Sequence, residues 1–247
     1  MIDSLGFLIL LIFLGSLVGF AFFGDRWPVF FRPLPGYEEL GNELERAVES
    51  GDRIHLSLGT GPLSGFESAP TFAGLAILAK IASSTMMSDK PLIVSTGDGA
   101  TTTLAQDTLY SAYRNAGAES RYTSTYARML GPTPFSYVAG IPALLSQEEV
   151  AVHILTGSFG IEGALAADFG RREGVFVLAG TEDVQAQALL YATADYPMIG
   201  EEIFAGGAYL DVGVFHKASL RSQDVVRLVI VAIILFGVLL RTAGIVP

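Results

Sequence analysis

Two long apolar segments, one near each end of the chain, constrain this sequence more than any other feature. Residues 5–23 read LGFLILLIFLGSLVGFAFF, and this stretch carries no charged side chain. An uncharged helix of about 19 residues is long enough to cross a bilayer core of roughly 30 Å. Residues 225–240 read VVRLVIVAIILFGVLL; Arg227 and Arg241 flank the uncharged part and can extend toward the membrane surface. The sequence therefore predicts two transmembrane helices.

Each apolar segment has an alternative interpretation. A cleaved signal peptide begins with basic residues and ends at a small-x-small cleavage site, whereas this chain starts Met1-Ile2-Asp3-Ser4 and leaves the first segment through aromatic residues. The second segment is short enough to be a buried or interfacial helix, but its all-round hydrophobic character and terminal position favour a span. We expect an N-terminal anchor over residues 1–27, a single domain over residues 28–222 and a C-terminal anchor over residues 223–247.

Basic and aromatic residues beside the two segments predict how the chain is oriented. Most juxtamembrane cations lie on the side of the connecting domain, whereas the tails carry only Arg241. The positive-inside rule then places the domain in the cytoplasm and both termini outside the plasma membrane. The residues expected at the membrane interface are Arg26, Trp27, Arg32, Lys217, Arg221 and Arg227.

Gly15 and Gly19 in the first segment have the spacing that allows transmembrane helices to approach closely. Glycine is also common in membrane helices without such a role. Packing and plain composition therefore explain the pattern equally well. If the pattern reflects packing, Gly15 contacts either the second segment or a neighbouring subunit.

Between the anchors, short apolar runs alternate with helical segments. This alternation is typical of βαβ units, whose parallel strands are buried on both faces. Right-handed crossovers arrange such units as a doubly wound α/β fold, a Rossmann-like three-layer sandwich with a mainly parallel sheet. Strands are expected within residues 53–58, 92–95, 126–130, 152–155 and 175–178, and a short helix within residues 196–211.

The predicted strands end in turns that are rich in glycine, serine and threonine. In a parallel sheet these turns gather at the carboxyl ends of the strands, where ligands usually bind. Glycine permits close backbone approach, hydroxyls donate hydrogen bonds, and helix N-termini attract anions such as phosphate. The candidates for binding a nucleotide or another small anion are Gly59, Thr60, Gly61, Thr96, Gly97, Thr101, Ser158 and Thr181.

The same residue types also serve βα turns and helix caps that bind no ligand, and this interpretation is favoured. The spacing of Gly59, Gly61 and Gly65 differs from the dinucleotide-binding G-x-G-x-x-G motif, and Pro62 removes an amide donor. The phosphate-binding motif G-x-x-x-x-G-K-[ST] is also missing.

Charge and composition exclude several classes of function. The formal net charge is −10, which disfavours nucleic acid as a partner because phosphate binding requires a cationic face. The chain has no cysteine, so disulfides and thiolate chemistry are excluded. No histidine and carboxylate cluster has metal-ligand spacing, and neither a metal nor a cofactor is expected. His55 and His153 fall within predicted strands, where a lone histidine is more often structural than catalytic.

Five segments carry a resemblance to a known family. They are HLSLGTGPLSGFESAPTFAGLAIL, STGDGATTTLAQDTLYSAYRNAG, ILTGSFGIEGALAADFG, LAGTEDVQAQALLYATADYPMIGEEIFAGGAYL and SLRSQDVVRLVIVAII. Together they resemble a family of bacterial two-span membrane proteins that is catalogued only as a domain of unknown function. The resemblance covers most of the chain, from the helix before Arg53 through the second anchor. It implies the same anchored α/β architecture and supplies no catalytic residues.

These features favour a non-enzymatic function. The leading hypothesis is a membrane-anchored scaffold or assembly module, with the lipid bilayer as one partner and either its own copies, as a homo-oligomer, or another membrane protein as the other. The alternative is a sensor that binds a nucleotide or other small anion at the strand ends. An enzyme using Asp98 or Ser158 ranks third, because the sequence shows no histidine or acidic partner for either residue.

Overall fold

The structure is a computed structural model that describes residues 4–24, 31–65 and 68–244. The chain divides into two compact units. One unit comprises residues 1–32 together with residues 213–247, and the other, called here the central domain, comprises residues 33–212.

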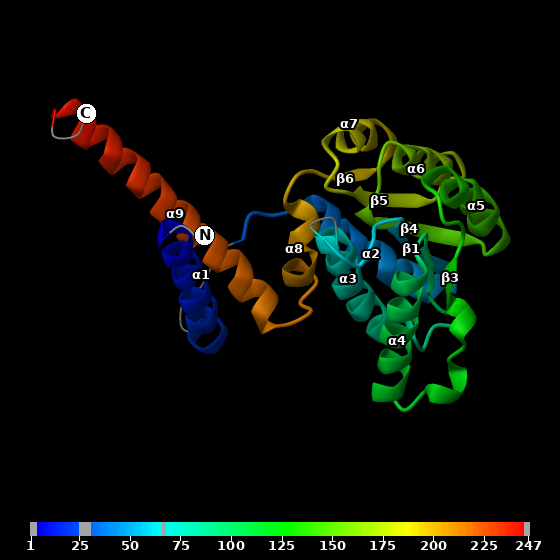
Figure 1. Ribbon diagram of the computed structural model, residues 1–247. Helices are drawn as coiled ribbons and strands as arrows, with labels where there is room; N and C mark the ends of the chain where they lie inside the picture. Colours follow the sequence, from blue (N-terminus) through cyan, green and yellow to red (C-terminus); the bar gives the residue numbers. More distant parts are fainter. Residues whose placement is uncertain (1–3, 25–30, 66–67, 245–247) are drawn as a thin grey trace. The chain divides into compact units, whose positions relative to one another are not determined.

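The first unit is built on two apolar helices, α1 (Ser4–Phe23) and α9 (Val214–Thr242) (Figure 1). Both helices are long and apolar enough to cross a membrane, and no residue in their most hydrophobic windows is buried by the protein. Exposed apolar side chains all round a helix suit a lipid environment. Two candidate membrane spans therefore lie where the sequence predicted them, whereas the predicted interfacial residues Arg26 and Trp27 fall outside the described residues.

α1 and α9 pack against each other. Arg221 of α9 donates from Nη1 to the carbonyl oxygen of Gly24 at 2.9 Å, and its guanidinium carbon lies 5.9 Å from the centre of the Phe20 ring. A cation at a helix C-terminus pairs with a carbonyl that the helix itself leaves unbonded, and it complements the helix dipole. No described atom of α9 lies within 4 Å of a Cβ placed on Gly15 or Gly19. The role of Gly15 and Gly19 in helix packing stays a prediction.

The central domain is organised around a six-stranded parallel sheet with the strand order β3-β2-β1-β4-β5-β6. The chain enters in the middle of the sheet, builds outward to one edge and then returns to build the other half, so the halves meet between β1 and β4. This order confirms the predicted doubly wound α/β fold. The strands are β1 (Arg53–Gly59), β2 (Ile93–Thr96), β3 (Ala127–Met129), β4 (Val150–Ser158), β5 (Phe176–Gly180) and β6 (Tyr196–Met198).

Helices cover both faces of the sheet (Figure 1). Helices α2, α3, α4 and α8 lie on one face, and α5, α6 and α7 lie on the other, which gives the three layers that the sequence predicted. The helices are α2 (Pro35–Ser50), α3 (Ala69–Thr85), α4 (Gly99–Asn115), α5 (Pro134–Gln147), α6 (Glu162–Arg172), α7 (Val184–Thr193) and α8 (Glu202–Tyr209), with short 3-10 turns η3 (Glu119–Arg121) and η4 (Ser124–Tyr126).

The hydrophobic core lies between the sheet and each helical layer. Every residue of β2 and all but the first residue of β1 are buried, as expected for strands covered on both faces. On the α5–α7 side, sheet residues such as Leu155 and Val177 belong to one core cluster with Tyr137 and Ile141 of α5. The core therefore packs α5 and α6 against this face of the sheet.

The last strand differs from the sequence expectation. Residues 196–211 were expected to hold only a short helix, but they begin with strand β6 and continue into α8. β6 has only three residues and contains Pro197, which a sheet tolerates at its edge. Asp195 fixes this edge because its Oδ2 accepts the Val177 amide at 2.9 Å and its own amide donates to the Val177 carbonyl oxygen at 3.1 Å.

Candidate functional site

The eight predicted ligand-binding residues lie together at the carboxyl ends of β1, β2, β4 and β5. Two backbone hydrogen bonds tie their turns together: the Thr60 amide donates to the Ser158 carbonyl oxygen at 3.2 Å, and the Gly97 amide donates to the Gly59 carbonyl oxygen at 2.7 Å. These turns flank the switch between the two halves of the sheet, which is the usual place for a ligand in such a fold. Their role in binding stays a prediction.

The turns after β1 and β4 are in direct contact. Gly59 has a φ of 73°, in the left-handed region that favours glycine. A Cβ on Gly59 would overlap the Ser158 carbonyl oxygen, and a Cβ on Gly61 would overlap the Ser158 side chain. The glycines at this point therefore allow one turn to pack on the other.

Three of the candidate threonines are buried and already hydrogen-bonded within the fold. Thr101 donates its amide (2.8 Å) and its hydroxyl (3.0 Å) to Oδ2 of Asp98, which caps the N-terminus of α4. Thr96 shares a hydrogen bond with the Thr102 hydroxyl. Thr181 accepts the Phe159 amide at 3.0 Å and lies 2.7 Å from the Phe159 carbonyl oxygen. This is the capping and turn role that the sequence favoured for these residue types.

The strand-end edge is acidic. The Ser158 hydroxyl donates to Oε1 of Glu182 at 2.6 Å, and the Thr181 hydroxyl lies 3.1 Å from the other carboxylate oxygen. The described turns over residues 60–65, 97–98, 159–161 and 181–183 contain the carboxylates of Asp98, Glu182 and Asp183 and neither lysine nor arginine. A phosphate would meet negative charge here without a cationic partner, so the side chains favour a neutral or cationic ligand over an anion.

Two buried hydroxyls beneath this edge have no hydrogen-bond partner among the described residues, namely those of Thr71 and Thr156. Thr71 lies in the first turn of α3, with its Oγ1 beside Gly61. An unpaired buried hydroxyl typically costs about 1–3 kcal/mol. These two groups are the strongest local indication that the edge holds a further polar molecule.

A buried polar network lies under the same strand ends, on the side of α5. The Nδ1 atoms of His55 and His153 are 2.8 Å apart, and Nε2 of His55 lies 2.8 Å from the Ser95 hydroxyl. The Ser95 hydroxyl lies 2.6 Å from the Tyr137 hydroxyl, which is also hydrogen-bonded to Ser57. All five residues are completely buried.

The pKa values in this network keep it neutral. Burial, followed by the neighbouring His153 and Arg128, holds the pKa of His55 well below its usual value, and burial lowers the pKa of His153 to about 3. Burial raises the pKa of Tyr137 to about 12. A neutral pair of histidines needs one Nδ1–H donor and one bare Nδ1 acceptor. Nε2 of His153 has no partner among the described groups, so we assign the donor to His153, which leaves only an acceptor unpaired.

This network was missed because each histidine was judged by itself. Register places His55 directly beside His153 on the neighbouring strand, although 98 positions separate them. One feature of the sequence could have indicated the network: His55 and Ser57 share one face of β1, because side chains two residues apart in a strand point the same way. Across the described part of the chain, no group of three His, Asp or Glu side chains is placed so that it could hold a metal ion.

A second candidate site is an apolar surface on the outer side of α6 and α7, called here the α6–α7 face. In a helix that covers a sheet, the outward side is normally polar. Here the outward stripe of α6 consists largely of Ile161, Leu165 and Phe169, which are 51%, 47% and 40% exposed. Phe135 at the start of α5 and Leu189 of α7, which are 65% and 45% exposed, belong to the same face.

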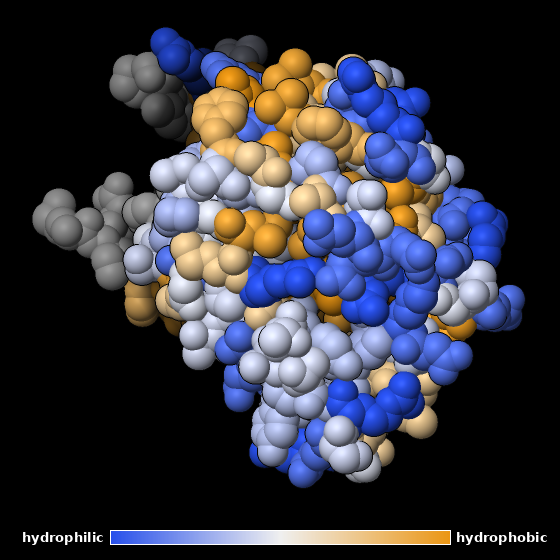
Figure 2. All heavy atoms as spheres, turned by 90° about the vertical axis from the view of Figure 1, so that its right-hand side faces the viewer, coloured by the Kyte–Doolittle hydropathy of each residue, from blue (hydrophilic) through white to orange (hydrophobic). Residues whose placement is uncertain are grey.

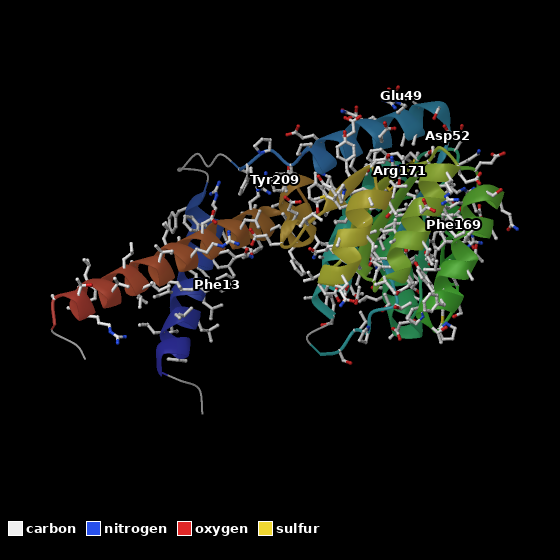
Figure 3. The ribbon with its side chains drawn as sticks, turned by 90° about the horizontal axis from the view of Figure 1, so that it is seen from above. Phe13, Glu49, Asp52, Phe169, Arg171 and Tyr209 are labelled. Atoms are coloured by element: carbon white, nitrogen blue, oxygen red, sulfur yellow. The ribbon has the colours of Figure 1, made fainter. Side chains whose placement is uncertain are left out.

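The figures show the same surface from two directions. Figure 2 shows hydrophobic side chains gathered toward the top of the central domain, the side on which α6 and α7 lie in Figure 1. Figure 3, seen from above, shows Phe169 and Arg171 in the layer of helices that faces the viewer. A groove of about 450 Å³ runs along α6 and is lined by residues that include Phe135, Leu165, Leu189 and Ala192. Exposed apolar patches of this kind typically mark interaction sites.

The fold and its flanking helices define the class of this protein: a doubly wound α/β domain combined with two helices that are long and apolar enough to span a membrane. Residues 2–246 match the model of the family described as Domain of unknown function (DUF6754), and the chain belongs to that family. No curated protein and no solved structure matches the chain.

Proposed function

We propose that this protein is a membrane-anchored, non-enzymatic assembly module. In this proposal α1 and α9 cross the plasma membrane, the central domain lies in the cytoplasm, and both termini lie outside. The central domain then presents the α6–α7 face to a protein partner. The observation that carries the proposal is the outward apolar stripe of α6, because a helix that already buries one side against a sheet has no structural need for it.

Energy considerations support protein binding at this face. Five large apolar side chains between 40% and 65% exposed would be solvated in a monomer. Burying apolar surface stabilises a complex by about 25 cal/mol per Å² before the costs of association. Because the partners are held in one membrane, their effective concentration is raised, and a modest contact area is sufficient for assembly.

The test compares two substitutions in the full-length protein purified in mild detergent. Leu165→Glu places a charge in the centre of the α6 stripe, and Phe72→Glu places one on α3, on the other helical layer, at a side chain of nearly equal exposure (50% against 47%). Light scattering coupled to size-exclusion chromatography is expected to show a smaller complex for Leu165→Glu and an unchanged one for Phe72→Glu. Equal sizes for Leu165→Glu and the unsubstituted protein would refute the proposal.

A second proposed function is ligand sensing at the strand-end edge. It is supported by the convergence of the eight candidate residues at the switch between β1 and β4, and by the unpaired hydroxyls of Thr71 and Thr156. The test is thermal unfolding with nucleotides, phosphorylated metabolites and their uncharged or amine-bearing analogues. A ligand at 100 times its Kd stabilises the folded state by about 2.7 kcal/mol. The acidic edge predicts a response to uncharged or amine compounds, and no response to any compound would remove this second function.

A further inference from the structure

We propose that the α6–α7 face binds a second copy of the same chain, with the two α6 helices antiparallel and Leu165 beside the two-fold axis. This inference rests on the proposed assembly function and names its partner. It follows from the shape of the face, from its distribution of charge and from the chemistry of the alternatives.

The stripe on α6 has the spacing of a helix-packing ridge. Ile161, Leu165 and Phe169 are each four residues apart, so they form one continuous row along the helix. When such rows on two helices interdigitate, the helices cross at about −50°, which is the commonest packing class in globular proteins. A ridge of this type matches another copy of itself.

The groove beside the ridge provides the complementary surface. Ala192 and Thr193, with Leu189, line the side formed by α7, and Phe135 lines the side formed by α5. Small side chains at Ala192 and Thr193 leave room for an incoming leucine or phenylalanine. Because ridge and groove lie on one face, a two-fold axis lets each copy insert its ridge into the groove of the other.

Charge is distributed so that opposite ends of the face attract. The end where α6 and α7 begin carries Glu182 and Asp183, whereas Glu162 is buried and accepts the Gly160 amide; residues 158–163 and 180–189 contain no lysine or arginine. The opposite end carries Arg171 and Arg172, whose side chains are 47% and 73% exposed, more than their acidic partners Asp195 (34%) and Asp168 (37%). An antiparallel arrangement places the arginines of one copy beside the carboxylates of the other.

The membrane surface is a poorer occupant for this face. A chain with a net charge of −10 is repelled by anionic lipid. The carboxylates of Glu182 and Asp183 at one end of the face would add to that repulsion. By contrast, two copies anchored in one membrane share the same orientation, which is compatible with a two-fold axis along the membrane normal.

Site-directed disulfide formation tests this arrangement, and the natural chain has no cysteine to interfere. Leu165→Cys, expressed in the full-length protein and oxidised in native membranes, is expected to give a covalent dimer, because the two copies of this residue lie next to each other across the axis. Ile161→Cys alone is expected to give none, whereas Ile161→Cys coexpressed with Phe169→Cys gives the mixed dimer. Met87→Cys, at a more exposed side chain away from the face (65% against 47%), is the control for random collision.

The possible results of this cross-linking experiment lead to different conclusions. A Leu165→Cys dimer well above the Met87→Cys background, together with the mixed dimer, supports the two-fold arrangement. If Leu165→Glu reduces the complex but Leu165→Cys gives only background, the partner is another protein, so this inference fails while the assembly function stands. A third outcome is that Leu165→Cys forms no more dimer than Met87→Cys and is shielded from a water-soluble maleimide only when lipid is present. In that case the face lies on the bilayer, and both this inference and the assembly function fail.

Discussion

His55 and His153 lie on neighbouring strands with their Nδ1 atoms 2.8 Å apart and their rings only 14° from parallel, in a region from which solvent is excluded. One ring nitrogen must donate and the other accept, so the contact is lost when both rings are protonated. Protonation of either ring would place a charge in the core, with Arg128 of β3 already opposing a charge on His55. The stability of the sheet therefore depends on the two histidine rings staying neutral.

The first prediction concerns stability and pH. The pKa of both histidines is lower in the folded chain than in the unfolded chain. As the pH falls below about 6.5, the unfolded chain therefore binds more protons than the folded chain. The stabilisation is fully present above that pH and is lost as the pH falls toward about 3, the folded pKa of His153. Each histidine contributes a slope of about 1.4 kcal/mol per pH unit in this window.

Urea unfolding of the full chain in detergent between pH 7 and pH 5 measures this slope. The His55→Gln/His153→Gln double variant lacks both titrating side chains and should show a smaller slope. An equal slope in both proteins would contradict the account.

The second prediction concerns Tyr137. Tyr137→Phe removes the hydroxyl that hydrogen-bonds to Ser57 and Ser95, and it leaves two buried serines with fewer partners. A loss of about 1–3 kcal/mol in the free energy of unfolding is expected. The same substitution at Tyr191, which is 74% exposed, should change stability by no more than about 0.5 kcal/mol. Chemical denaturation of both variants provides the comparison, and equal effects would mean that the network does not contribute to stability.

The third prediction separates capping from ligand binding at the strand ends. Asp98→Ala removes the carboxylate that accepts the Thr101 amide at the start of α4. We expect a loss of about 1 kcal/mol in the absence of any ligand. Asp107→Ala, at an exposed position in the middle of α4, is the matched control. If thermal unfolding shows Asp98→Ala to be as stable as Asp107→Ala, capping is not the role of this carboxylate.

The fourth prediction concerns orientation in the membrane. A single cysteine introduced by Glu119→Cys, in the central domain, is expected to react with an impermeant maleimide only after the cells are opened. A cysteine introduced by Thr242→Cys, at the end of α9, is expected to react in intact cells. The reverse pattern would place the central domain outside, and labelling of both in intact cells would mean that α9 does not cross the membrane.

The parallel sheet could be predicted from the sequence because its central strands are short apolar runs between helices. Burial on both faces leaves a compositional signal that does not depend on which strand lies beside which. The edge strand β6 left no such signal, since its three residues, Tyr196–Met198, include a proline and need burial on fewer sides.

The sites were harder to predict than the fold, for two physical reasons. The pairing of His55 with His153 depends on strand order and register, which local composition does not encode. The outward position of Leu165 depends on which side of α6 faces the sheet, and a helix rich in alanine and glycine, EGALAADFGRR, buries its small residues instead of its large ones. The convergence of the glycine-rich turns was predictable, because the carboxyl ends of parallel strands always share an edge.

Native mass spectrometry of the full-length protein, released from membranes without substitution or cross-linker, tests the central claim most directly. Self-assembly through the α6–α7 face predicts a species with twice the mass of the 26.2 kDa chain, which dissociates in the Leu165→Glu variant. A protein that appears only as the single chain, at every concentration and in every detergent that preserves its fold, would contradict it.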